Sequence, residues 1–194
     1  MIEFAFQYYI VADASTAVNY GQGDLVVTYS RGYARKDFVI DGGFEGYTCD
    51  GFCYTESYAN WVATSSPDGS LDASFIHFAD YAHSGSSSAL LGSGFDFDTL
   101  PGTITPTAAL ATASGKQYTI TFFHYSGYSG PDFEQDAFVD IKWNNNVVAT
   151  ITPGYSSWTY YSFTVTGAGN DVLAFHGGEA PAWSFLDDIH VFQI

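Results

Sequence analysis

An aspartate near the carboxyl end of the sequence has the setting of a metal ligand. Asp187 lies in a strand-like run and shares its alternation with Ile189 and Val191, which predicts that its carboxylate points to the buried face of a sheet. A buried carboxylate needs a compensating partner, and the chain has only 5 Lys and Arg residues against 21 Asp and Glu residues. A Ca²⁺ ion, which binds oxygen atoms, would provide that partner. The alternative is that Asp187 ends a strand in solvent.

A second group of acids alternates along a loop that is rich in Gly, Ser and Pro. Asp132, Glu134 and Asp136 would face the same way in an extended chain, as binding to a metal ion or to sugar hydroxyl groups requires. Surface solubility explains the same pattern without any ligand.

Tyrosine and tryptophan residues in the loops offer a different chemistry, because planar rings pack on the apolar faces of sugar rings. Tyr128 lies next to the acidic loop, and Trp158 follows a turn. The residues that we expect to contact a ligand are Tyr54, Tyr58, Tyr125, Tyr128, Asp132, Glu134, Asp136 and Trp158. Incidental exposure would also explain the loop tyrosines. Trp61, Trp143 and Trp183 lie in strand-like motifs, so we expect them in the core.

The chain has two cysteines, Cys49 and Cys53, in one short loop. We expect a disulfide rather than half of a metal site, because no second Cys or His pair lies at zinc-site spacing. A disulfide predicts an oxidising, extracellular compartment, although residues 1–7 lack the pattern of a secretory signal peptide.

Composition and motifs exclude several classes of protein. A formal net charge of −16 disfavours nucleic acid as a partner, since a phosphate backbone must be neutralised by Lys and Arg. No apolar run approaches the roughly 20 residues that a membrane-spanning helix needs. The sequence has no nucleophile elbow, zinc-protease or phosphate-binding-loop motif, so an enzyme of polysaccharide breakdown is the least favoured hypothesis.

The elements that must position these residues are β-strands. Alternating runs are separated by Gly, Pro, Ser, Asn and Asp clusters roughly every 8–12 residues, which predicts a β-sandwich. The expected strands are residues 24–30, 74–78, 117–125, 137–143, 147–151, 159–166, 171–176 and 186–193. The three asparagines at 144–146 predict a hairpin turn, because Asn tolerates a positive φ.

The charge distribution divides the chain near residue 41. Residues 1–40 contain three of the five basic residues and four of the 21 acids, so residues 41–194 carry 17 acids and two lysines, a net charge of −15. The first part has two strand-like runs, 4–11 and 25–29, which are too few for a core of their own. We expect residues 1–40 to pack on the main domain, to pair with another copy in a homo-oligomer, or to be the tail of an upstream domain.

Six motifs follow one another after this boundary. They are Asp-Gly-Gly-Phe-Glu at 41–45 followed by Trp61, and the segments 82–90, 115–122, 138–144, 160–166 and 181–191. In this order they resemble the carbohydrate-binding-module-type jelly rolls of the galactose-binding-like superfold, which are common in secreted proteins. The sequence departs from the family at Asp41, where Asn is usual, and in the insert 49–58.

The resemblance implies an all-β jelly-roll sandwich for residues 41–194. It also implies a structural Ca²⁺ ion bound by Glu45 of the opening motif and Asp187 of the closing motif. We expect a noncatalytic carbohydrate-binding module or lectin, with a neutral polysaccharide or glycoprotein glycan as ligand, because the acidic surface repels anionic sugars. An adhesion or assembly module that binds protein through its aromatic loops and residues 1–40 is the second hypothesis.

Overall fold

The computed structural model describes residues 35–95 and 97–194, apart from the side chain of Asp136. The chain divides into two compact units, Met1–Lys36 and Asp37–Ile194, and the second contains all of the elements described below. The strands expected at 4–11 and 24–30 lie outside the described residues. The role of residues 1–40 therefore stays a prediction.

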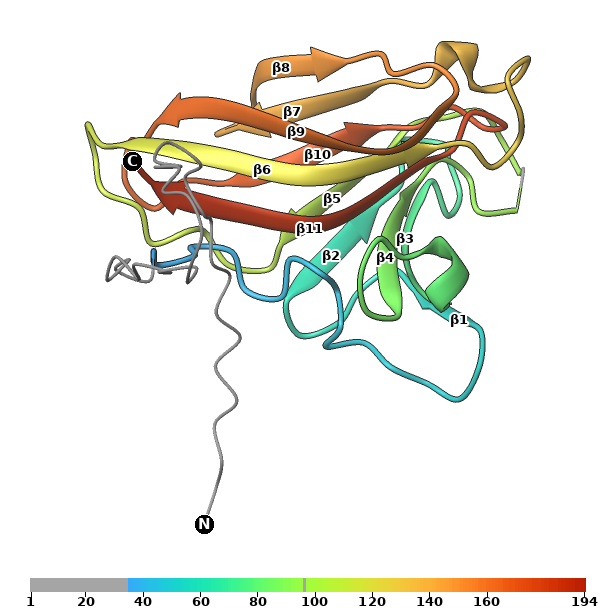
Figure 1. The fold of residues 1–194 in the computed structure, drawn as a ribbon, viewed down its shortest axis with the longest axis horizontal. Helices are drawn as coiled ribbons and strands as arrows, with labels where there is room; N and C mark the ends of the chain where they lie inside the picture. The colour runs from blue at the N-terminus through green and yellow to red at the C-terminus, as the bar shows by residue number, and fades with distance from the viewer. Residues whose placement is uncertain (1–34, 96) are drawn as a thin grey trace, which may run out of the picture. The chain divides into compact units, whose positions relative to one another are not determined.

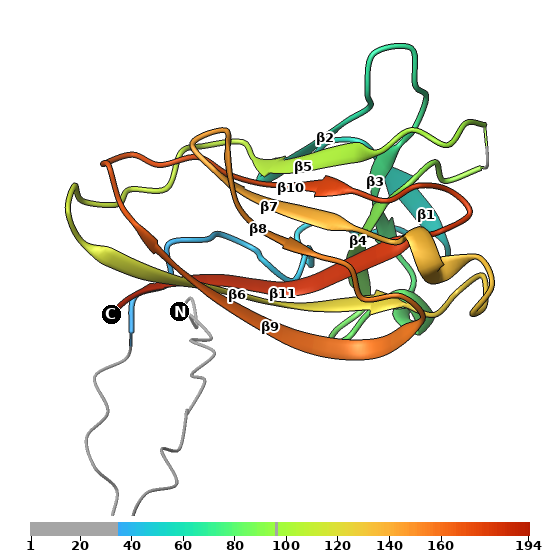
Figure 2. The same ribbon diagram turned by 90° about the horizontal axis from the view of Figure 1, so that it is seen from above.

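The unit Asp37–Ile194 is built from two antiparallel sheets, which confirms the predicted β-sandwich (Figures 1 and 2). The six-stranded sheet has the order β1 (Cys53–Thr55), β3 (Ala73–His77), β4 (Ser87–Leu91), β11 (Ser184–Gln193), β6 (Gln117–Ser126) and β9 (Ser156–Thr166). The five-stranded sheet has the order β2 (Trp61–Thr64), β5 (Gly102–Pro106), β10 (Leu173–Gly177), β7 (Val139–Trp143) and β8 (Asn146–Ile151). Figure 2 shows the second sheet lying above β6, β11 and β9.

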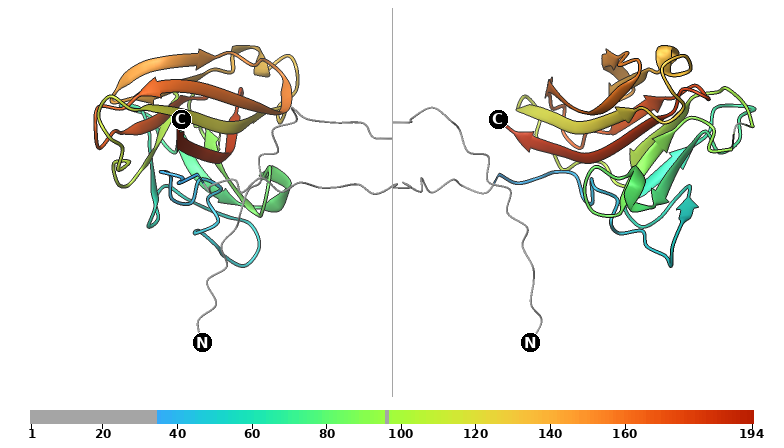
Figure 3. Two further views of the ribbon diagram at one scale, coloured as in Figure 1. Left: turned by 60° about the vertical axis from the view of Figure 1, so that its left-hand side comes forward. Right: turned by 45° about the vertical axis from the view of Figure 1, so that its right-hand side comes forward.

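The core lies between the two sheets and follows from the alternation of each strand. In β6, Tyr118, Ile120 and Phe122 point inward, and Phe175 of β10 meets Phe122 at a ring-centroid distance of 5.0 Å. Figure 3 shows β11, in dark red, beside β6, in yellow, as their pairing requires. Jelly-roll order places the last strand in the middle of its sheet and leaves β1 and β9 at the edges.

Two of the three tryptophans expected in the core lie there. Trp61 and Trp143 are buried between the sheets, whereas Trp183 is half-buried on the outer side of the six-stranded sheet, where its Nε1 donates to the Ser93 carbonyl at 3.0 Å. The prediction for Trp183 was wrong because it precedes β11 and lies in a loop rather than in a strand.

Most expected strands are present, and the differences have local causes. Strands β1, β2, β4 and β5 were not predicted, since they are three to five residues long and β4 is buried on both faces. Asn144 and Asn145 have φ values of 53° and 64°, which confirms the hairpin turn between β7 and β8. The acidic loop is not extended, because Glu134–Asp136 forms a single 3-10 turn, η2.

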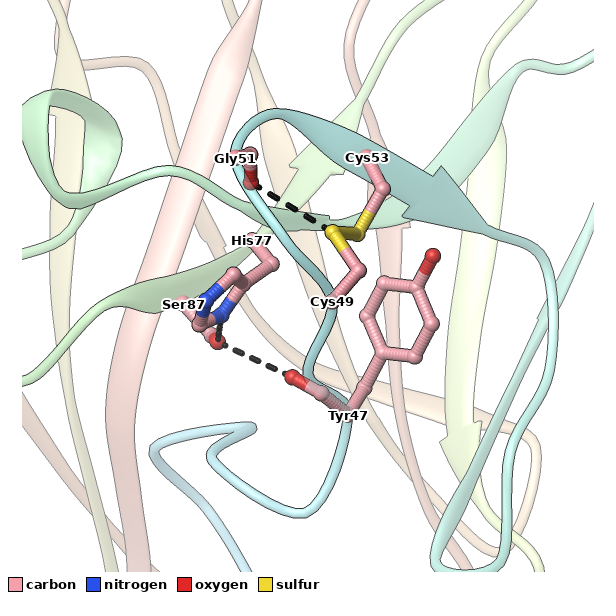
Figure 4. The surroundings of a disulfide bond; sticks show 6 residues. All are labelled: Tyr47, Cys49, Gly51, Cys53, His77 and Ser87. Atoms are coloured by element: carbon pink, nitrogen blue, oxygen red, sulfur yellow. Dashed lines mark hydrogen bonds between the residues drawn. A yellow bond between two sulfur atoms is a disulfide. The ribbon is translucent and has the colours of Figure 1, made fainter.

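A disulfide joins Cys49 to Cys53, as predicted (Figure 4). Cys53 begins β1 and is paired with His77 of β3, whose Nδ1 lies 2.9 Å from the Ser87 hydroxyl group. The disulfide therefore closes the insert directly at the edge of the six-stranded sheet. Neither short helix of the described residues is long and apolar enough to cross a membrane.

Candidate functional site

The outer face of the six-stranded sheet is covered with aromatic rings. In β6, the alternation that points Phe122 and His124 inward points Phe123 and Tyr125 outward. The same face receives Trp158 from β9, Phe185 from β11, and further rings from the 3-10 helix η1 (Ala79–Tyr81) and the loops. We call this surface the aromatic face; its members are Phe52, Phe78, Tyr81, His83, Phe123, Tyr125, Tyr128, Trp158, Tyr160, Trp183 and Phe185.

Successive rings of the aromatic face touch one another from one edge of the sheet to the other. From the β1 edge, Phe52 meets Phe78 at 5.8 Å, Phe78 meets Tyr81 at 5.4 Å, and Tyr81 meets Phe185 at 5.2 Å. Tyr125 continues the series, at 5.8 Å from Phe185 and 5.5 Å from Trp158. The result is a continuous series of ring contacts that crosses the strands, with the almost fully buried Phe185 at its centre and partly exposed rings on both sides.

A histidine adds a polar group near the β9 end of this surface. The imidazole of His83 stacks on Phe123 at a centroid distance of 3.6 Å and lies 5.5 Å from Trp158. Its Nδ1 is 2.7 Å from Oδ2 of Asp188, which fixes the orientation of the ring. Tyr160, which is more than half exposed, packs against the other side of Phe123.

Three of the residues expected to contact a ligand are brought together on the aromatic face. They are Tyr125, Tyr128 and Trp158. Tyr54 lies farther along the same sheet, at the β1 edge, where it meets Phe95 at 5.3 Å.

Tyr58 lies away from this surface. Its ring packs at 5.3 Å against Phe75 of the core, and its hydroxyl group donates to Oδ2 of Asp41 at 2.8 Å. Burial and the Asp41 carboxylate raise the pKa of Tyr58. The same oxygen of Asp41 also accepts from the Asn60 side chain and from the Gly46 backbone.

The three acids of the loop do not form the row that their spacing predicts. Asp132 is exposed, whereas Glu134 is fully buried beneath the loop, and the side chain of Asp136 lies outside the described residues. The expectation that they face the same way fails because η2 replaces an extended chain.

Several members of the aromatic face were missed by the sequence reasoning. Phe123 shares its alternation with Tyr125, so this signal was available in the sequence. Phe185 is paired with Tyr125 across β11 and β6, so the two rings lie on the same face. This could be predicted only if the register between the two strands were known. His83 and Tyr81 come from a connection between strands, and no local pattern shows where their side chains point.

Asp187 is buried, as predicted, but on the opposite face of the sheet. A β-bulge between Asp187 and His190 adds one residue to β11, so Asp187 pairs with Phe123 while Ile189 and Val191 point to the core. The simple alternation was wrong because it did not include the bulge, where Asp188 has a φ of 50°.

Backbone amides of the loop between η1 and β4 surround the two predicted metal ligands. Oδ2 of Asp187 accepts from the N–H groups of His83 at 2.8 Å and Ser84 at 3.0 Å. Oε1 of Glu45 accepts from those of Ser86 at 2.6 Å and Ser87 at 2.9 Å. Burial raises the pKa of Asp187 to about 7, against these donors. The backbone donors therefore offset only part of the cost of burying the Asp187 charge.

The donors near Gly43 fit a hard cation in their chemistry. A Cβ atom on Gly43 would lie 3.6 Å from Oδ1 of Asp188, 3.7 Å from Oδ1 of Asp187 and 4.0 Å from Cγ of Glu45, so three acidic side chains gather at one place. No three or more His, Cys, Asp or Glu side chains in 35–95 and 97–194 form a metal-binding group. A Ca²⁺ ion bound by Glu45 and Asp187 would need carbonyl or water oxygen atoms for the rest of its coordination.

Comparison with known proteins adds evidence at the level of the fold. No family model and no curated protein matches the sequence. The solved structure of TmCBM61 in complex with beta-1,4-galactotriose is similar at a TM-score of 0.52, with 12% identity over 82% of this chain and 99% of that one.

Two further structures are similar at lower scores. The CBM22-1 xylan-binding domain from Paenibacillus barcinonensis Xyn10C has a TM-score of 0.46 with 10% identity, over 82% of this chain and 96% of that one. The K3 cleaved adhesin domain of Lys-gingipain from Porphyromonas gingivalis has a TM-score of 0.45 with 19% identity, over 80% and 97%. With its two sheets and strand order, the chain has a jelly-roll β-sandwich fold similar to that of TmCBM61.

Proposed function

We propose that this protein is a noncatalytic carbohydrate-binding module or lectin that binds a neutral glycan on the aromatic face. The observation that carries the proposal is the continuous series of ring contacts from Phe52 to Trp158 across the six-stranded sheet. Soluble proteins rarely expose large apolar patches unless they serve as binding sites. The partly exposed rings on either side of Phe185 offer apolar faces on which the sugars of a glycan can pack.

The polar groups around the rings support a ligand that carries hydroxyl groups. His83, the Asp188 carboxylate and the tyrosine hydroxyl groups provide donors and acceptors beside the apolar surface. The small number of Lys and Arg residues restricts the charge of the ligand, because a net charge of −16 repels acidic sugars at low ionic strength. A neutral glycan avoids this repulsion.

A panel of immobilised neutral glycans, followed by calorimetry on the best ligand, tests this proposal. We expect binding by the full chain and a loss of binding when Tyr125 and Trp158 are both replaced by alanine. Retained folding of that variant is checked by circular dichroism. Failure of the full chain to bind any neutral polysaccharide or glycoprotein glycan would contradict the proposal.

A structural Ca²⁺ ion at Glu45 and Asp187 is the second part of the proposal. Its support is the oxygen-only donor set and the gathering of acidic side chains around Gly43. A bound ion stabilises the folded state by mass action, so added Ca²⁺ should raise the melting temperature and EDTA should lower it. Asp187→Asn should abolish that response. A melting curve that EDTA leaves unchanged would rule out the ion.

The Cys49–Cys53 disulfide supports an extracellular location. A test is the oxidation state of the two thiols in protein taken from its native host, measured by alkylation and mass spectrometry. Free thiols in that material would contradict an oxidising compartment.

An adhesion module that binds protein is a second candidate, and exposed phenylalanines favour it. Phe95 and Phe97 touch each other at 5.4 Å near the β1 edge and are about half and two-thirds exposed, at 49% and 66%. A phenyl ring has no hydroxyl group to bond with a sugar. Oligomers in light scattering, together with no binding on the glycan panel, would favour this candidate.

A further inference from the structure

The loop between β6 and β7 contains a buried carboxylate that does not reach the surface. Glu134 is fully buried, although its neighbours Asp132 and Phe133 are exposed. Its Oε1 accepts a hydrogen bond from the backbone N–H of Ser129 at 2.9 Å. The carboxylate thus binds the tip of its own loop from within.

This arrangement is costly, which indicates that it has a use. The second oxygen atom, Oε2, is buried and has no hydrogen-bond partner among the described residues. Burial raises the pKa of Glu134, while the backbone amides of Ser129 and Tyr128 lower it. An apolar side chain would avoid the desolvation cost of a buried carboxylate, but it would leave the Ser129 N–H without its acceptor.

The loop tip carries a ring of the aromatic face. Tyr128 meets Trp183 at a centroid distance of 4.8 Å, Tyr81 at 5.5 Å and Phe185 at 6.3 Å. A side-chain hydrogen bond with Tyr128 is the main cause that raises the pKa of Tyr81 to about 12. The Tyr128 ring nevertheless stays about half exposed. Its neighbours therefore hold it in place while one part of it remains open to a ligand.

The remaining backbone bonds of the loop lead back to Glu134. The N–H groups of Phe133 and Glu134 both donate to the Gly130 carbonyl at 3.1 Å, and the Ala137 N–H donates to the Glu134 carbonyl at 3.3 Å. These bonds close the carboxyl side of the loop. The tip of the loop, at residues 128–129, is held by the hydrogen bond that the Ser129 N–H donates to the Glu134 carboxylate.

We infer that Glu134 is a positioning residue of the aromatic face: its buried carboxylate fixes the backbone at Tyr128 and Ser129 and so presents the Tyr128 ring to the ligand. The inference rests on the proposed function, because it assigns Tyr128 to the glycan surface. It also changes the role expected from the sequence, in which Glu134 contacts the ligand directly.

A double-mutant cycle tests this inference. We expect Tyr128→Ala and Glu134→Ala each to weaken binding to the best neutral glycan roughly fivefold, within the range of a lost ring contact. The double variant should be no weaker than Tyr128→Ala alone, because both changes remove the same ring contact. Glu134→Gln, whose side-chain oxygen can still accept from the Ser129 N–H, should restore most of the affinity.

Asp68→Asn is the matched control. It removes one exposed carboxylate that is distant in sequence from Glu134, and it should leave the affinity unchanged. Independent, multiplicative losses in the cycle would overturn the inference, as would a Glu134→Ala protein that binds like the wild type. A purely structural role would lower the melting temperature without this dependence on Tyr128.

Amide hydrogen exchange of the unmodified protein gives a second measurement if Glu134→Ala does not fold. The Ser129 amide should be protected although it lies in a surface loop, and rapid exchange at this amide would overturn the inference. This result does not depend on a ligand. A protein that binds no glycan but protects the Ser129 amide would therefore disprove the proposed function and leave the role of Glu134 in the loop intact.

Discussion

The outer faces of the two sheets differ in chemistry although their inner faces are alike. Both inner faces consist of aliphatic and aromatic side chains that meet in one core. The outer face of the six-stranded sheet is the aromatic face, whereas the outward residues of the five-stranded sheet are aliphatic or polar, with His176 as the one ring among them: Val62, Thr64, Thr103, Thr105, Asp140, Lys142, Val147, Thr150, Ala174 and His176. Folding requires only the inner faces to be apolar, so the rings on one outer face point to a function.

The largest expected effect concerns stability on the aromatic face. Phe185→Ala should lower the free energy of unfolding by about 4 kcal/mol, because the ring is almost fully buried among Tyr81, Tyr125 and Tyr128. On the other outer face, His176→Ala should cost less than about 1 kcal/mol. Urea unfolding measures both. Equal losses would show that the two outer faces pack alike.

The dependence of stability on pH tests the burial of His124, which points inward from β6, beneath the aromatic face. Burial lowers the pKa of His124 to about 3, so below the ordinary value of 6.5 the unfolded chain takes up a proton that the folded chain does not. Stability should therefore fall as the pH falls from 6.5 towards 3. At pH 5 the loss is roughly 2 kcal/mol.

His124→Gln isolates this term, because its side chain does not titrate. The free energy of unfolding of the wild type minus that of the variant should fall by roughly 2 kcal/mol between pH 8 and pH 5. The raised pKa of Asp187 acts in the opposite direction, but equally in both proteins, so it cancels. A difference that stays constant with pH would show that His124 is accessible to solvent.

The third effect separates the two faces in binding. Trp158→Ala should weaken binding to a neutral glycan about tenfold, as expected for a lost aromatic contact. Val62→Ala, on the opposite face, should leave the affinity unchanged. Calorimetry measures both, and a loss in the Val62 variant alone would place the ligand on the five-stranded sheet.

The smallest expected effect is that of salt. If the ligand is neutral, raising the NaCl concentration should change its affinity by less than about twofold, because screening affects only charged partners. A strong increase in affinity with salt would indicate that the aromatic face takes an anionic ligand against the repulsion of the acidic surface.

The fold could be predicted largely because its strands show the period-two pattern of a half-buried sheet. In β6, Tyr118, Ile120 and Phe122 alternate with Thr119 and Thr121, and β9 has a similar alternating pattern. Strands such as β4, Ser-Ser-Ala-Leu-Leu, have no alternation because both of their faces are covered. Their positions depend on neighbours that are distant in the sequence.

The site could be predicted only in part. Tyr125, Tyr128 and Trp158 lie together on the aromatic face, and their contact with a ligand stays a prediction. The direction of Asp187 was not found, since a bulge has no signature in the residue types, and the burial of Glu134 depends on a 3-10 turn in place of an extended chain. Both errors came from extending a strand pattern through an irregular segment.

The place of β9 at the end of its sheet has a consequence for self-association. Its eleven residues contain no charged side chain, and one row of its backbone N–H and C=O groups has no neighbouring strand in the described sheet. Such an edge is a template on which a second molecule can extend the sheet. The acidic surface opposes that contact, because two copies that approach edge to edge repel each other. We therefore expect the negative charge of the chain to oppose edge-to-edge pairing at β9, and acidification that neutralises the carboxylates to weaken this repulsion.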